Sequence, residues 1–124
     1  MITAPTRELA QQLFNNAKLM MKADPALSVK LITGGSNREK MNESLKNQPH
    51  IVIGTPGRIK DLFLNEESLL VQNAKIMIVD EADMTLEYGF LEEVDAICGK
   101  TLGHSSRLSA LYLSDFCQQP QRSR

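Results

Sequence analysis

The chain has 124 residues, of which 42% are hydrophobic and 23% are charged, and its formal net charge is −1. This is the composition of a soluble globular protein, and the length suffices for one domain at most. No apolar run approaches the roughly 20 residues of a membrane span, so we expect no membrane partner. Cys98 and Cys117 lack metal-type spacing, which favours a reduced, cytoplasmic protein.

Short apolar runs of β type alternate with helical patterns along the first 99 residues. The β-type runs lie at 1–4, 29–33, 50–54 and 75–79, with helical periodicity between them and after the last. This alternation predicts an α/β fold with a parallel sheet flanked by helices. Two helix starts carry cap signals. Ser36 stands three positions before Glu39, as in a capping box, and Thr55 precedes Pro56, which suits a first helical turn.

The periodic patterns stop at about residue 100. We therefore divide the chain into a domain-like part, residues 1–100, and an irregular tail, residues 101–124, with Gly99 ending the last helix. The tail is predicted to make few long-range contacts and not to complete the sheet. A frameshift would explain it, because codons for residues 116–119, shifted by one base, can encode Ser-Ala-Asn. The run "CGKT" (98–101) is not a phosphate-binding loop, since Val94 replaces its first glycine.

Four distinctive clusters each follow a predicted strand. In chain order they are "APTREL" (4–9), "TGG" (33–35), "GTPGR" (54–58) and "DEAD" (80–83). Ligands of open parallel sheets bind outside the carboxyl ends of the strands, so the four clusters are expected to form one site. Nucleotide hydrolases use an aspartate directly after an apolar strand to hold Mg²⁺ beside the phosphates, and a neighbouring glutamate can activate the attacking water.

The run "VDEAD", with "APTREL" upstream, "TPGR" between and "GF" downstream, resembles the first RecA-like domain of a DEAD-box RNA helicase of bacterial type. The likeness covers about residues 1–99. It implies a partial RecA-like sheet of the P-loop NTPase type without the P-loop strand, with an open apolar edge or groove in its place. It also implies a fragment of an enzyme that unwinds RNA with ATP and Mg²⁺. The family's P-loop, Ser-Ala-Thr motif and second RecA-like domain find no match in the sequence, so we expect the isolated chain to be inactive.

The resemblance also implies a role for individual residues. Asp80 would bind Mg²⁺ through water, Glu81 would be the catalytic base, and Asp83 would couple hydrolysis to movement of the second domain. The implied contacts to the RNA backbone come from Pro5, Thr6, Arg7, Glu8, Gly34, Gly35, Thr55, Pro56, Gly57 and Arg58. Helix N-termini, glycine backbones and arginine forks all suit phosphate, which favours largely sequence-independent RNA binding.

Plainer interpretations of the same residues stay open. The carboxylates of residues 80–83 also suit a helix N-terminus, where the helix dipole favours acidic side chains. Arg7 and Arg58 also suit solvated positions near helix starts. For the whole chain, the alternatives to a helicase fragment are a non-catalytic RNA-binding or interaction module and a non-functional truncation product.

Overall fold

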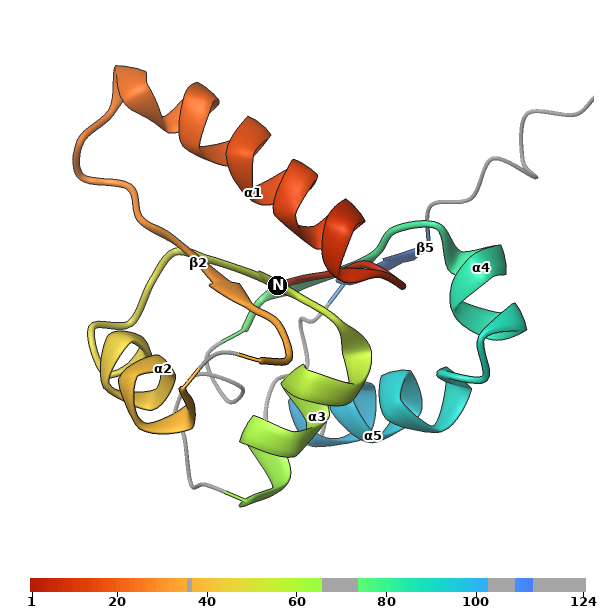
Figure 1. Ribbon diagram of the computed structural model, residues 1–124. Helices are drawn as coiled ribbons and strands as arrows, with labels where there is room; N and C mark the ends of the chain where they lie inside the picture. Colours follow the sequence, from red (N-terminus) through yellow and green to blue (C-terminus); the bar gives the residue numbers. More distant parts are fainter. Residues whose placement is uncertain (36, 66–73, 103–108, 113–124) are drawn as a thin grey trace, which may run out of the picture.

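The computed structural model describes residues 1–35, 37–65, 74–102 and 109–112 (Figure 1). Within these ranges, five strands pair in parallel in the order β2-β3-β1-β4-β5. The strands are β1 (Ile2–Thr3), β2 (Val29–Ile32), β3 (Ile51–Gly54), β4 (Ile76–Val79) and β5 (Ser109–Tyr112). The parallel α/β sheet expected from the alternating pattern is confirmed, with one strand more than the four predicted.

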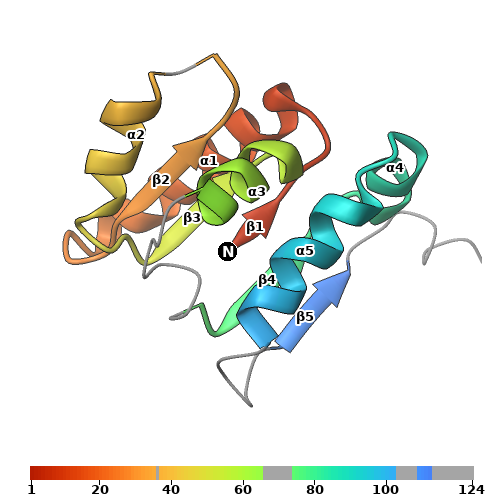
Figure 2. The same ribbon diagram turned by 90° about the horizontal axis from the view of Figure 1, so that it is seen from below.

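The helices cover both faces of this sheet. They are α1 (Arg7–Met20), a 3₁₀ turn (Met21–Ala23), α2 (Arg38–Leu45), α3 (Pro56–Asn65), α4 (Ala82–Glu87) and α5 (Leu91–Leu102). Helix α1 lies across one face, whereas α3 and α5 pack side by side on the other (Figures 1 and 2). None of the described helices is long and apolar enough to cross a membrane.

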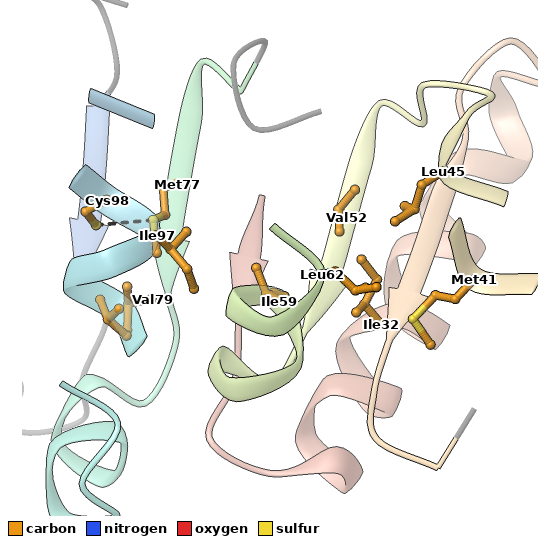
Figure 3. Close-up of a cluster of buried hydrophobic side chains, with 11 residues drawn as sticks. Ile32, Met41, Leu45, Val52, Ile59, Leu62, Met77, Val79, Ile97 and Cys98 are labelled. Carbon is orange, nitrogen blue, oxygen red and sulfur yellow. Dashed lines mark hydrogen bonds between the residues drawn. The ribbon is translucent and has the colours of Figure 1, made fainter. Parts of the chain in front are cut away.

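Two apolar clusters hold these layers together, one on each face of the sheet. On the α1 side, buried Ala10 packs with Ile53 and with the partly buried Leu13. On the opposite side, α2, α3 and α5 bury a larger set against the strands (Figure 3), namely Ile32, Met41, Leu45, Val52, Ile59, Leu62, Met77, Val79, Val94, Ile97 and Cys98. Neighbours along one strand, such as Val52 and Ile53, enter different clusters because successive strand side chains point to opposite faces.

The helix starts agree with the sequence in one case and differ in the other. Helix α3 begins at Pro56, as predicted, and the Thr55 carbonyl accepts from the Ile59 N–H at 3.0 Å. Helix α2 is capped by Asn37, whose side-chain oxygen accepts from the Lys40 N–H at 3.2 Å. The expected cap, Ser36, lies outside the described residues. The capping-box assignment is therefore one residue early, because asparagine caps as well as serine does.

The prediction of an irregular tail from residue 101 is wrong for residues 109–112. Strand β5 pairs along its whole length with β4, from Ile76↔Ser109 to Val79↔Tyr112. Unpaired backbone groups along β4 favour such a ladder, even for a short run with no sustained period. Helix α5 also continues through Gly99 to Leu102, so Gly99 does not end it. The loss of pattern at residue 100, which suggested a frameshift, is thus accompanied by regular structure at residues 101–102 and 109–112. Residues 116–119 lie outside the described residues.

Candidate functional site

The four clusters singled out in the sequence lie at the carboxyl ends of four neighbouring strands. In the sheet order β2-β3-β1-β4, "TGG" follows Ile32 of β2 and "GTPGR" starts at Gly54, the last residue of β3. "APTREL" follows Thr3 of β1, and "DEAD" follows Val79 of β4. The expectation that they share one edge of the sheet is therefore met by the topology. Helices α1 and α3 also begin at this edge, so their N-terminal N–H groups point toward it, which favours anions.

A pocket of about 610 Å³, which we call the rim groove, opens at this edge. Its lining residues are Pro5, Thr6, Arg7, Glu8, Gly34, Thr55, Gly57, Arg58, Asp61 and Phe90. It brings together most of the residues for which the resemblance implied RNA contacts. Two of that set do not line it: Pro56 is buried in the protein, and Gly35 is exposed and has φ +88°.

Arg7 and Gly34 join two of the sequence clusters inside the rim groove. A Cβ atom built on Gly34 would lie 2.6 Å from Arg7 Nη2, so the guanidinium group rests directly against the glycine backbone. The backbone of Arg7 is fixed at the start of α1, where the Thr6 side-chain oxygen accepts from the Leu9 N–H at 3.2 Å. The Arg7 guanidinium can occupy this position only because Gly34 has no side chain.

Gly34→Ala is expected to displace the Arg7 guanidinium without unfolding the protein. The new methyl group meets only the far end of a flexible side chain, which can turn away at little cost. We expect an unchanged denaturation midpoint and, for the RNA binding that the resemblance implies, an affinity lowered about as much as by Arg7→Ala. Urea denaturation and RNA titration of the two single variants and the double variant check this. Additive effects of the two substitutions would show that Gly34 acts independently of Arg7.

Arg58 lies one helical turn before Asp61 on α3. Its Nη1 atom donates to Asp61 Oδ2 at 3.2 Å, and the Arg58 side chain is 19% exposed. The same carboxylate oxygen is 3.9 Å from Arg38 Nη1 on α2. Sequence reasoning missed Asp61 and Phe90 as groove residues. The spacing of Asp61 from Arg58 was a usable signal, because residues three apart on a helix are neighbours.

The acidic cluster lies where β4 passes into α4. The Asp80 N–H donates to the Thr3 carbonyl at 2.9 Å, which ties the cluster to β1. Glu81 has the left-handed conformation, φ 48° and ψ 54°, and immediately precedes α4. Asp83 lies in the first turn of α4, and its Oδ1 atom is buried with no hydrogen-bond partner among the described residues. Asp80 and Glu81 do not line the rim groove, so the acidic cluster and the groove are separate parts of one edge.

The acidic cluster is not a complete metal site on its own. In the described part of the chain, no three His, Cys, Asp or Glu side chains converge in a way that could hold a metal ion. Mg²⁺ usually keeps several waters and binds through one or two carboxylates together with substrate phosphates. The donor set therefore fits Mg²⁺ held by Asp80 with phosphate and water, and does not fit an all-protein cage.

Comparison with known proteins gives a consistent result. The DEAD/DEAH box helicase family model matches residues 1–114, which extends the likeness beyond residue 99 and through β5. The chain is 48% identical over 100 residues to the DEAD-box ATP-dependent RNA helicase CshB of Listeria monocytogenes, covering 80% of the chain and 23% of that relative. With CshB of Bacillus subtilis it shares 45% identity over 98 residues, covering 77% and 22%.

Solved structures agree with the curated relatives. Mss116p bound to ssRNA and AMP-PNP superposes with a TM-score of 0.80 at 30% identity, covering 91% of the chain and 24% of that protein. A DEAD box protein from Methanococcus jannaschii gives a TM-score of 0.79 at 35% identity, covering 97% and 31%. The chain spans about a quarter of the length of the curated relatives that it matches.

Proposed function

Because the chain belongs to the DEAD/DEAH box helicase family, we propose that it is a segment of an ATP-dependent RNA helicase that grips the RNA backbone and supplies the carboxylates for ATP hydrolysis. The rim groove is the observation that carries this proposal. It gathers Arg7, Arg58 and Gly34 from three separate clusters at one edge of the sheet. Guanidinium groups, glycine backbone and the N-termini of α1 and α3 all suit phosphate oxygens.

RNA binding by this groove is expected to depend little on sequence. Contacts to phosphate and sugar fix the register and orientation of a nucleic acid without distinguishing its bases. Phe90 adds an apolar surface to the groove, but the charged groups that suit phosphate are the arginines. The similar helicase structure with bound ssRNA and AMP-PNP supports both RNA and nucleotide as ligands of this fold.

The acidic cluster is the proposed catalytic part. When bound, Mg²⁺ would neutralise charge on the phosphates of ATP. Asp80 would hold the ion through water, and the carboxylate of Glu81 would take a proton from the attacking water. Asp83, with a buried carboxylate oxygen, would hydrogen-bond to later motifs of a complete enzyme and so link hydrolysis to domain movement. These roles require the phosphates of ATP to be held beside Asp80 and Glu81. The rim groove cannot hold them there, because neither residue lines it.

Arg58→Ala is expected to weaken binding to single-stranded RNA, with a similar loss for RNAs of different sequence. Removing one phosphate contact should lower the slope of log affinity against log salt by about 0.7. Fluorescence anisotropy over a salt series, with two unrelated oligonucleotides, measures both quantities. Lys18→Ala is the control, because it removes the same charge in the last turn of α1, away from the groove. RNA affinity unchanged by Arg58→Ala would contradict the role given to this residue.

A further inference from the structure

Arg38 is a cationic side chain that the sequence clusters do not include. It does not line the rim groove itself but forms an ion pair with Asp61, which does. It is the first residue of α2, and its Nη1 atom lies 3.9 Å from Asp61 Oδ2 on α3. The same oxygen accepts the hydrogen bond from Arg58 Nη1 at 3.2 Å. Two guanidinium groups from two helices therefore converge on a single carboxylate oxygen, and Asp61 and Arg58 line the groove.

We propose that Arg38 is a further RNA-phosphate-binding residue, that it forms a two-arginine site with Arg58, and that Asp61 is the positioning residue of this site. The inference rests on the proposed RNA-binding function of the rim groove. It adds an element of the chain, helix α2, from which the resemblance implied no contact.

The exposures of the three side chains support this division of roles. Arg38 is 43% exposed and Asp61 is 40% exposed, whereas Arg58 is 19% exposed. An exposed ion pair at the distance of Arg38 and Asp61 contributes little to stability, so exchanging this one contact for a contact to phosphate costs little. The better buried Arg58 keeps its shorter bond to Asp61.

Asp61 makes it possible for the two arginines to lie close together. Two guanidinium groups facing one region would repel each other, and the carboxylate between them offsets that repulsion. The group as a whole still carries an excess positive charge. A phosphate group in the groove can therefore accept from two guanidinium groups whose positions are already fixed, and the arginines need not be ordered from free side chains.

The test is an NMR titration of the full 124-residue chain with single-stranded oligouridylate, repeated at several salt concentrations. Arg38→Ala is expected to lower the affinity about fivefold and the salt slope by about 0.7. Lys40→Ala is the matched control, because it removes the same charge from the same helix. Two positions along a helix turn the side chain about 200° away from Arg38, and Lys40 is exposed. Lys40→Ala should leave the affinity within about twofold.

The positioning role of Asp61 needs a separate measurement. In an Asp61→Asn background, Arg38→Ala is expected to lower the RNA affinity by less than half the factor seen in the unmodified chain, because the carboxylate that pairs with both Arg38 and Arg58 is gone. An equal cost in both backgrounds would show that Asp61 does not position Arg38.

The outcomes separate this inference from the proposed function. If Arg58→Ala weakens RNA binding but Arg38→Ala behaves like Lys40→Ala, Arg38 is not a phosphate ligand and the proposed function stands. If the unmodified chain binds no RNA at millimolar concentration, the RNA-binding function of the groove is itself wrong, and the inference falls with it.

Discussion

Glu81→Gln is expected to abolish ATP hydrolysis while leaving nucleotide and RNA binding intact. The experiment uses a chimera in which residues 1–114 replace the matching segment of CshB from Listeria monocytogenes, so that the rest of the helicase is present. Glutamine can still hydrogen-bond to water but cannot accept its proton, and general-base catalysis contributes a factor of about 10² to 10⁴. Steady-state ATPase rates, with RNA and nucleotide affinities measured in parallel, check the prediction.

A matched control is the acidic residue at the other end of α4, the helix that Glu81 immediately precedes. Glu87→Gln makes the same change from carboxylate to amide at the last residue of α4, where the side chain is exposed, and should leave turnover unchanged. Full turnover in the Glu81→Gln chimera would rule out Glu81 as the base. The isolated 124-residue chain should show no ATPase above background, because its residues include no P-loop pattern to place phosphates beside Asp80. Robust hydrolysis by the isolated chain would overturn the assignment of the whole acidic cluster.

Gly54→Ala is expected to have the largest effect on folding, destabilising the protein by about 3 kcal/mol. Gly54 ends β3, between β2 and β1, and a Cβ atom there would lie 2.2 Å from the Ile32 carbonyl oxygen. The same atom would lie 3.1 Å from Ile59 Cδ1. A methyl group can fit only if β2 and β3 move apart, because the nearest obstacle is backbone and not the end of a side chain.

Urea denaturation of the two glycine variants tests this expectation. Gly99→Ala is the control, since Gly99 lies within α5 and a Cβ atom there meets nothing within 4 Å. Alanine is favoured over glycine inside a helix, so this variant should be as stable as the parent or about 1 kcal/mol more stable. Equal denaturation midpoints for Gly54→Ala and the parent would contradict the prediction. They would show that β2 and β3 can move apart to fit the methyl group at no cost in stability.

The sequence was sufficient for the parts of the fold with strong local patterns. Apolar runs bounded by polar clusters located β2, β3 and β4. The rule that ligands bind at the carboxyl ends of parallel strands then placed Arg7 and Arg58 at one edge of the sheet, where both line the rim groove. The four polar clusters could be assigned to this edge because each lies where an apolar strand pattern ends.

Two features could not be read from the sequence for physical reasons. Strand β5 is only four residues long, and its partner β4 lies more than 30 positions earlier. The local hydrophobic pattern is therefore too short to predict β5. The convergence of Arg38 and Arg58 on Asp61 depends on how α2 and α3 pack, which is a tertiary property. Asp61 is detectable as a helical neighbour of Arg58, whereas Arg38 becomes visible only with the structure.

The central place of β1 has a consequence for the order of events during synthesis. Ile2 pairs with Ile53 on one side and with Ile78 on the other. At about 5 to 20 residues per second, translation takes roughly 3 to 10 s to reach the first of these partners, and β1 stays unpaired in that interval. Every strand contact in the described sheet is parallel and joins distant segments, so loop-closure entropy slows folding. Strand β1 therefore has no partner strand in the described sheet until residues of β3 have been synthesised, and its backbone groups stay unpaired until then.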